Sequence, residues 1–440
     1  MKKHEKVFSL LMVLIILFSM LAGCSNTSSN KDSETKDNVS NANSDKEINI
    51  LMESVPDTEI ITKHISEFEA KTGIKVNIES INYSSMHEKL LTQMLGSTNA
   101  YDVIVVDCYW TGEFVEAGWL EDLGSYIEKS GFDTSVYIDS MMDMVGEVDG
   151  TTYMIPFYNY MMSLVYRTDV FEDEALKTSY KAAYGKEFAI PDTFEEYIEM
   201  CKFITSESKG EMYGAVMQGL RPDPIAVEWL NYLYTCGGDF YDEAGNIIIN
   251  NEAAVKALDL YIDNINNAAP KGATGYGFDE AFNVFAQGDA ATYMTYNWMV
   301  PKLNNDNEST VQGLVDISPI PNGTSLNAGW GWAIPRNAPD KDASWEFIQW
   351  VESFDMAKTR ALDGGSPTRE DVMKDSEVLK AYPYLSTVLD IMKASKILPV
   401  MADTPKLVEV LGRELSLAAT NEKTSQEALD TVAEEMKSMK

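Results

Sequence analysis

The sequence predicts an α/β protein that is divided into two lobes or domains. Its 440 residues exceed what one compact core usually holds, and 45% of them are hydrophobic, which is enough for a globular protein. From residue 48 onward, short apolar runs typical of strands alternate with stretches of helical spacing. Because a β-α-β-α-β order is typical of parallel sheets, we expect a parallel, doubly wound sheet.

The first part of the chain carries this pattern most clearly. Strand-like runs occupy residues 48–52, 74–80 and 101–107. Apolar residues at helical spacing follow the first two runs, and Gly73 and Gly96 are plausible ends for these helices. A third helical stretch continues to Trp119. Ligand sites in such sheets lie beyond the carboxyl ends of the strands, so the residues after each strand are site candidates.

The remaining elements are read in the same way. Residues 150–167 form two strand-like runs on either side of Pro156. Further strands are expected at 291–298, 315–321 and 329–335, and helices at 193–206, 251–267, 278–287 and 340–353. Asp340 opens the last of these helices, residues 236–246 are rich in turn formers, and the chain beyond about residue 377 is mainly helical.

The charge of the chain argues against some partners. The formal net charge is −34, which repels nucleic-acid phosphates and anionic membrane surfaces. We therefore expect no nucleic-acid partner.

The N-terminus has the features of an export signal. A basic head precedes a hydrophobic run, Val7 to Met20, which is short for a membrane span. The sequence "LAGC" follows and resembles the bacterial lipoprotein signal, in which the cysteine is lipidated and becomes the mature N-terminus. We expect residues 1–23 to be a signal peptide, Cys24 to be lipidated, and residues 24–46, which are almost entirely polar, to form a disordered tether.

The other cysteines do not predict a metal site. Cys108, Cys201 and Cys236 follow no CxxC or zinc spacing, and we expect small buried residues and no metal or cofactor. Their odd number leaves at least one unpaired within the chain, and a Cys201–Cys236 disulfide stays open.

From residue 47 to the end, the chain resembles the extracellular solute-binding proteins of carbohydrate ABC importers, the group that includes maltose-binding protein. The resemblance rests on the order and spacing of several segments: "SEFEAKTGIKVN", "YDVIVVD" with "EAGWLEDL", "GTTYMIPFYNYMMSLVYRTDVF", "PDTFEEYIEMCKFIT", "FAQGDAATYMTYNW", "GWGWAIPRNAPDKDASWEFIQW" and "LDGGSPTRE". It implies a two-lobe periplasmic-binding-protein-like fold of the type II arrangement, with ligand in the cleft between lobes that close by hinge bending.

By this resemblance the chain crosses between the lobes near Pro156, Asn327 to Trp330, and Ser366 to Glu370. Lobe 1 would comprise 47–155 and 331–368, and lobe 2 would comprise 156–330 and 369–440.

Aromatic residues are the first candidates for a sugar site, because a sugar ring has an apolar C–H face and a rim of hydroxyls. Trp330 and Trp332 lie where the family places a stacking tryptophan, and Trp330 is favoured because it is nearer the crossing. We interpret the glycines beside them as room for ligand and ring to approach the backbone. Trp298 with Asn297 matches another family position that supplies an aromatic wall. Tyr109 and Trp110 follow a predicted strand and would form the facing wall, although any of these rings would also suit the core.

Polar candidates would bind the hydroxyl rim. Asp107 and Glu53 each lie at a predicted strand end; Asp107 would also suit a helix cap, and Glu53 an ordinary surface position. Tyr158 and Asn159 follow the Pro156 crossing. Arg369 lies in a loop where some family members direct an arginine at the ligand, with an inter-lobe salt bridge as its alternative role, and Gln218 is the last candidate.

The resemblance implies a non-enzymatic receptor that captures a neutral sugar, from monosaccharide to short oligosaccharide or polyol, and presents it to ABC permease subunits. We expect a monomer, lipid-anchored at the outer face of the cytoplasmic membrane, with a Gram-positive surface favoured. The alternative is a surface-anchored glycan-processing enzyme, which needs two carboxylates at set distances. A structural lipoprotein is a third reading. Apart from His4 in the signal, only His64 and His87 are present, and catalytic triads and zinc motifs are absent.

Overall fold

The computed structural model describes residues 46–96, 98–304 and 307–440. They belong to a compact unit, Asp45–Lys440. The predicted signal peptide (1–23), the lipidation site Cys24 and the tether (24–46, apart from Lys46) lie outside the described residues.

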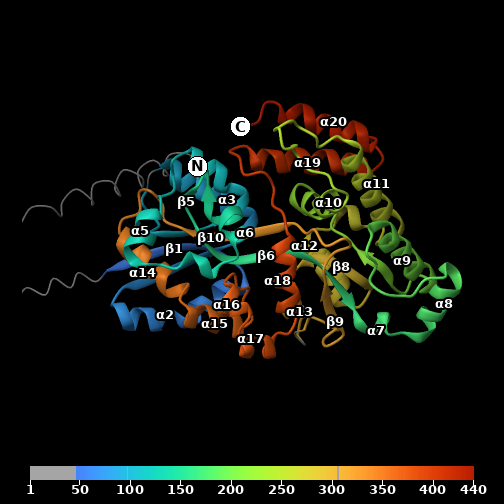
Figure 1. The fold of residues 1–440 in the computed structure, drawn as a ribbon, viewed down its shortest axis with the longest axis horizontal. Helices are drawn as coiled ribbons and strands as arrows, with labels where there is room; N and C mark the ends of the chain where they lie inside the picture. Colours follow the sequence, from blue (N-terminus) through green and yellow to red (C-terminus); the bar gives the residue numbers. More distant parts are fainter. Residues whose placement is uncertain (1–45, 97, 305–306) are drawn as a thin grey trace, which may run out of the picture. The chain divides into compact units, whose positions relative to one another are not determined.

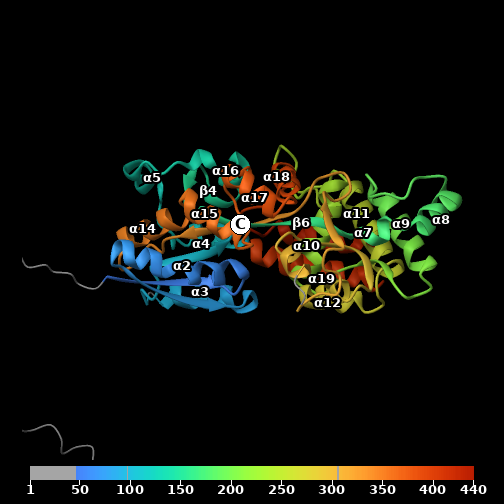
Figure 2. The ribbon, with the colours of Figure 1, turned by 90° about the horizontal axis from the view of Figure 1, so that it is seen from below.

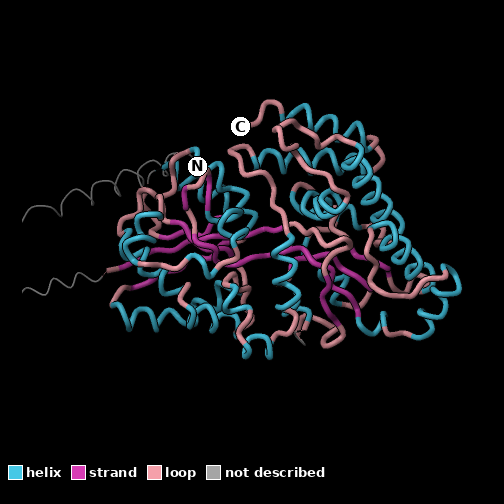
Figure 3. The backbone as a smooth tube through the Cα atoms, in the orientation of Figure 1, coloured by secondary structure: helices cyan, strands magenta, loops and turns pink. Residues whose placement is uncertain are grey.

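One mixed sheet runs through the unit, with helices on both faces (Figure 3). Its strands follow the order β2-β1-β3-β10-β6-β8-β7, and β9 pairs with β6 beside this path. Their bounds are β1 (Glu47–Glu53), β2 (Lys75–Ile81), β3 (Val103–Asp107), β6 (Ile155–Arg167), β7 (Tyr213–Val216), β8 (Ala290–Tyr296), β9 (Val315–Ser318) and β10 (Asn327–Ala333). A separate hairpin joins β4 (Glu147–Val148) to β5 (Thr151–Thr152).

The parallel sheet predicted for the first part of the chain is present in β2, β1 and β3. The helix between β1 and β2 begins with Pro56, whose fixed φ suits the first turn, and Gly73 ends it in the left-handed conformation with φ 76°. Beyond β3 the sheet is no longer parallel, because β10 runs antiparallel to both β3 and β6.

The longest strand, β6, joins the two halves of this sheet (Figure 1). Ile155 to Met161 pair with β10, and Met162 to Arg167 pair with β8 and β9. The prediction of two runs divided at Pro156 was therefore wrong: Pro156 lies inside the strand. Trp330 pairs with Tyr158 and Gly331 with Pro156, so Phe157 is an extra residue that forms a bulge in β6 directly after the proline, which has no N–H to donate to a ladder.

Helices cover both faces of each half (Figures 1 and 2). The helices of the first half, including two that follow β10 in the chain, are α2 (Pro56–Thr72), α3 (Tyr83–Gly96), α4 (Cys108–Glu116), α5 (Gly124–Ser130), α6 (Asp139–Met141), α14 (Lys341–Val351) and α15 (Phe354–Leu362). The others are α7 (Thr168–Phe171), α8 (Glu174–Tyr184), α9 (Phe194–Glu207), α10 (Asp223–Thr235), α11 (Glu252–Asn267), α12 (Phe278–Ala286), α13 (Met299–Leu303), α16 (Glu370–Met373), α17 (Ser376–Ala381), α18 (Leu385–Ala394), α19 (Thr404–Ala419) and α20 (Ser425–Met436).

The cysteines Cys108, Cys201 and Cys236 are free thiols. Cys201 lies against Thr292 with a sulfur–oxygen distance of 3.7 Å and is fully buried, while Cys236 is half-buried. Within the described part of the chain, no helix combines the length and apolar character that a membrane span requires.

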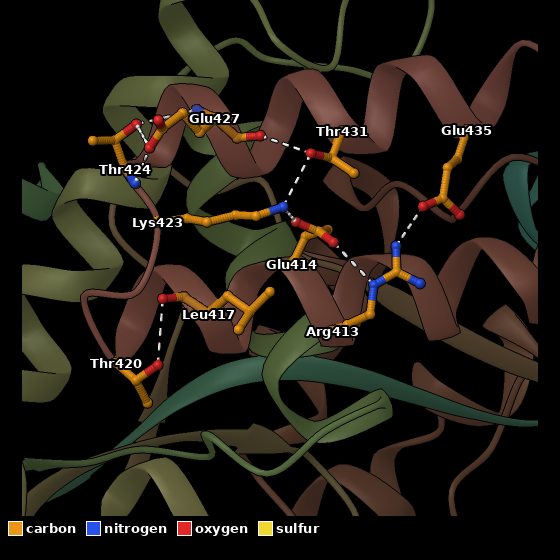
Figure 4. A network of polar contacts seen from close by, with 9 residues as sticks. All are labelled: Arg413, Glu414, Leu417, Thr420, Lys423, Thr424, Glu427, Thr431 and Glu435. Atoms are coloured by element: carbon orange, nitrogen blue, oxygen red, sulfur yellow. Dashed lines mark hydrogen bonds and ion pairs between the residues drawn. The ribbon is translucent and has the colours of Figure 1, made fainter.

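The last two helices, α19 and α20, are joined by a network of charged groups (Figure 4). Glu414 is its centre: its side chain is 3% exposed and it accepts hydrogen bonds from Arg413 Nε at 2.9 Å and from Lys423. Lys423 also donates to the Thr431 hydroxyl on α20 at 3.1 Å. The buried carboxylate thus compensates two cations whose outer parts stay in water.

Replacing Glu414 with alanine is expected to lower the free energy of unfolding by about 1–2 kcal/mol, because Lys423 loses its carboxylate partner and Arg413 keeps only Glu435. Urea denaturation measures this change. Glu434→Ala is the matched control, since Glu434 pairs with Lys437 on the same helix but its side chain is 73% exposed. Such an exposed pair contributes at most about 0.5 kcal/mol, and equal losses in the two variants would contradict the prediction.

Candidate ligand-binding site

A cavity of about 550 Å³ opens beyond the carboxyl ends of β1 and β3. Its volume is typical of small-molecule sites. Seven aromatic side chains line it: Tyr83, Tyr109, Tyr160, Phe278, Tyr296, Trp298 and Trp330. Five carboxyl side chains also line it: Glu53, Asp107, Asp223, Asp279 and Glu280. The cavity wall therefore combines flat apolar faces with strong hydrogen-bond acceptors.

The strand-end carboxylates are held by the local backbone and by one tyrosine. Asp107 caps α4, and its Oδ1 accepts a hydrogen bond from the Tyr109 N–H at 3.1 Å. Glu53 Oε2 accepts a hydrogen bond from the Tyr158 hydroxyl at 2.7 Å. Both predicted roles of Asp107 are therefore compatible: one oxygen caps the helix while the residue lines the cavity.

Burial raises the pKa of these carboxyl groups. The pKa of Asp107 is raised to about 7, that of Glu53 to about 8 and that of Asp223 to about 6, in each case chiefly because the surrounding protein replaces water. The negative charges also act on one another: Asp107 raises the pKa of Glu53, and Asp223 raises that of Asp107.

Trp330 lies in the middle of the joined sheet and beside the cavity. In the register of β10 it pairs with Asp107 on β3 and with Tyr158 on β6. Its ring meets that of Trp110 edge to face, with the centroids 5.3 Å apart. Trp110 in turn stacks on Tyr83 at 5.6 Å. These contacts fix the orientation of a ring that forms part of the cavity wall.

Five predicted site residues line the cavity: Glu53, Asp107, Tyr109, Trp298 and Trp330. Trp110 and Tyr158 lie one layer behind, where Trp110 supports Trp330 and Tyr158 holds Glu53. These two side chains position the wall and do not form its surface.

Three of the other predicted residues have structural partners instead. Trp332 is fully buried, stacks on Phe157 with centroids 4.1 Å apart, and donates its Nε1–H to Glu352. Asn297 accepts a hydrogen bond from the Met161 N–H, and Gln218 donates to Glu228 and to the Met294 carbonyl. The Phe347 ring of α14 packs edge to face on Trp332, with the centroids 5.6 Å apart.

The last two lie away from the cavity as well. Arg369 forms an ion pair with Asp371 at 2.7 Å and donates to the Glu352 carbonyl, so its charge is used locally. Asn159 is fully buried, and neither its side-chain nitrogen nor its oxygen has a hydrogen-bond partner among the described residues.

The glycines beside the two tryptophans serve packing. A Cβ on Gly329 would lie 2.2 Å from Val145 Cγ2, and one on Gly331 would lie 2.6 Å from Met154 Cβ. The prediction that they leave room for ligand was wrong, because side chains of the protein occupy that space.

The cavity also includes residues that the sequence did not single out, among them Asn82, Tyr83, Tyr160, Asp223, Phe278 and Tyr296. Asn82 and Tyr83 follow β2 directly, so the rule that selected Glu53 and Asp107 would have found them. Tyr160 lies two residues from Tyr158 on the same face of β6. Asp223 opens α10, a helix that was not predicted, and only the tertiary fold brings it to the cavity.

The chain is similar to known bacterial solute-binding proteins. The family model of the bacterial extracellular solute-binding proteins matches residues 53–357. A probable amino-acid ABC transporter periplasmic-binding protein of Sinorhizobium fredii is 25% identical over 323 residues, which are 73% of this chain and 72% of that protein.

Two solved structures share the fold. An ABC transporter solute-binding protein of Agrobacterium radiobacter K84 in complex with ribitol has a TM-score of 0.77 and 26% identity, covering 89% of this chain and 98% of that one. Maltose-bound MalE3 of T. maritima has a TM-score of 0.77 and 27% identity, covering 89% and 99%.

The chain belongs to the bacterial extracellular solute-binding protein family. The predicted family and the predicted two-lobe α/β fold are thereby confirmed. The matched proteins are binding proteins and not enzymes, so the chain is a binding protein and the glycan-processing alternative is not favoured.

Proposed function

We propose that this chain binds a sugar or a polyol in the cavity and delivers it to the permease subunits of an ABC importer. The observation that carries the proposal is the cavity itself, in which aromatic rings and carboxyl groups surround about 550 Å³. Aromatic faces suit the C–H surfaces of a sugar, and carboxylates accept hydrogen bonds from its hydroxyls. The solved relatives with ribitol and maltose support this ligand class.

Delivery would depend on closure of two lobes, 47–155 with 331–368 and 156–330 with 369–440. The cavity draws Glu53, Asp107 and Tyr109 from the first set and Asp223, Trp298 and Trp330 from the second. The proposed boundaries at Pro156 and Trp330 coincide with the bulge between β6 and β10. A bulge interrupts the ladder, so the strands can bend there while the sheet stays joined.

The sequence and the family support a location outside the cytoplasm. We propose a monomer anchored by a lipid on Cys24 to the outer face of the cytoplasmic membrane, with a Gram-positive surface favoured. The anchor would hold the receptor near its permease, and the polar segment after Cys24 would let it turn.

A thermal-shift screen against monosaccharides, polyols and short oligosaccharides tests the proposal. The protein would comprise residues 25–440, which keep the whole compact unit Asp45–Lys440. A ligand at about 100 times its dissociation constant should stabilise the native state by about 2.7 kcal/mol. This raises the unfolding midpoint by a few degrees. We expect Trp330→Ala to abolish the shift, because it removes the ring that lines the cavity beside Asp107.

Two further variants make the test specific. Trp330→Phe keeps an aromatic face and should recover part of the shift. Tyr184→Ala, which removes an aromatic side chain that is 39% exposed and lies outside the cavity, should leave the shift unchanged. If no sugar or polyol stabilises the protein, or if Trp330→Ala binds as the wild type does, the proposal fails.

A further inference from the structure

In the described structure, the cavity is lined by acidic side chains and by no basic side chain. Among the described residues that line it, five carry carboxyl groups and none is lysine, arginine or histidine. The side chain of Lys302 lies 5.7 Å from the ring of Trp298, which lines the cavity. Its charge, however, lies over the Phe282 ring and pairs with Glu308. Elsewhere in the described chain, the buried carboxylates Glu352 and Glu414 have arginine or lysine partners, while the buried Glu228 and Asp102 accept hydrogen bonds from neutral donors. The cavity differs from all of these in gathering several carboxyl groups around one space. The cavity carboxylates have only neutral donors in the described structure, of which the Tyr158 hydroxyl is one.

Three of these acids lie close enough to repel one another. Glu53 and Asp107 come from strand ends, and Asp223 comes from the first turn of α10 across the cavity. The charge of Asp107 raises the pKa of Glu53, and the charge of Asp223 raises that of Asp107. The Tyr83 hydroxyl lies near both aspartates and lowers the pKa of each. Farther out, Asp57 acts on Glu53 and Glu409 acts on Asp223, and both are negative as well.

The other walls also suit a cation. Tyr109 lines the cavity, and its hydroxyl is buried next to Tyr296. Trp298, Trp330 and Tyr296 present aromatic rings, which attract cations as well as the apolar faces of sugars. Asn82 and Ser84 add neutral groups that are able to bind hydroxyls.

We propose that the preferred ligand is a sugar or polyol that carries a protonated amino group, and that this group binds between Glu53, Asp107 and Asp223. The inference rests on the proposed function and narrows its ligand class. An ammonium group would favour the charged form of these carboxyl groups and donate three hydrogen bonds to them. An amino acid fits less well, since its carboxylate would enter a cavity lined by carboxyl groups and by no basic residue.

Matched pairs of ligands test the inference. Isothermal titration calorimetry of residues 25–440 would compare glucosamine with glucose and N-acetylglucosamine, and 1-amino-1-deoxysorbitol with sorbitol. We expect at least one amine to bind about tenfold or more tightly than its neutral partners at about pH 7. Its affinity should fall about tenfold between about pH 7 and pH 5.5, because Asp107 and Asp223, whose pKa values are about 7 and about 6, take up protons while the amine keeps its charge.

Variants separate a charge effect from a loss of shape. Asp223→Asn keeps the size of the side chain and should weaken the amine more than its neutral partner. Asp390→Asn removes a charge from an exposed position outside the cavity and should change neither affinity.

Each outcome has a separate meaning. If neutral sugars bind as tightly as the amines, the inference is overturned while the receptor proposal stands. Binding of amino acids in place of sugars overturns both, and so does the absence of binding by every sugar, polyol and amine.

Discussion

Replacing Glu352 with alanine is expected to lower the free energy of unfolding by about 3–5 kcal/mol, the largest loss among the substitutions considered. Glu352 is fully buried and accepts hydrogen bonds from Arg360 Nη2 at 2.8 Å, Trp332 Nε1 at 2.9 Å and the Tyr137 hydroxyl at 3.3 Å. Without it, Arg360, which is 4% exposed, keeps its charge without this partner. Two further buried donors lose their acceptor. Chemical denaturation at neutral pH measures the change.

A double-mutant cycle shows whether the pair causes the loss. Arg360→Ala removes the other partner. The double variant should lose less free energy of unfolding than the two single variants lose together. Glu352→Gln, which keeps an acceptor of similar shape, should lie between the wild type and the alanine variant. A loss below about 1 kcal/mol in Glu352→Ala would show that the buried network contributes little to stability.

Replacing Asp107 with asparagine is expected to change how the stability of the ligand-free protein depends on pH. The pKa of Asp107 is raised from 3.8 to about 7 in the folded state, so between these values the folded chain holds a proton that the unfolded chain releases. The contribution of Asp107 to stability is therefore present below about pH 4 and is lost as the pH rises to about 7, by at most about 4 kcal/mol. Asparagine does not titrate and still caps a helix.

The measurement is the unfolding midpoint of wild type and variant across this range. The difference between them should move in favour of the variant as the pH rises, and should be largest at about pH 7 and above. Glu53 and Asp223, whose pKa values are raised in the same direction, will leave part of the slope in the variant. Asp390→Asn controls for the loss of one charge, and parallel profiles for wild type and Asp107→Asn would refute the prediction.

Much of the fold was predictable because hydrophobic spacing records local structure. The parallel unit of β1, β2 and β3, the helix end at Gly73 and the Asp340 cap follow from short-range rules, and the structure has them. Pro156 misled the prediction because its missing N–H matters only if a ladder needs it, and here the strand bulges at the next residue, Phe157. The antiparallel entry of β10 between β3 and β6 depends on pairing between distant segments, which spacing does not encode.

In the candidate site, too, residues whose positions follow from local rules were predicted, and residues placed by tertiary packing were not. Glu53 and Asp107 were found because strand ends meet at one edge of a sheet. Trp330 and Trp332 were indistinguishable by alternation, and only the helix that carries Phe347 and the Glu352 acceptor place Trp332 in the core. Asp223 belongs to a distant helix, so its arrival at the cavity could not be read from local pattern.

The position of β10 has a consequence for when the protein becomes able to fold. Residues 327–333 lie between β3 and β6 in the sheet, although both partners are synthesised long before them. Until this strand emerges, β3 and β6 each lack a neighbour, and the sheet cannot be completed across its middle. If the chain is exported in extended form, as the proposed signal peptide requires, it would gain from this delay, because the topology would postpone completion of the sheet until most of the polypeptide has been made.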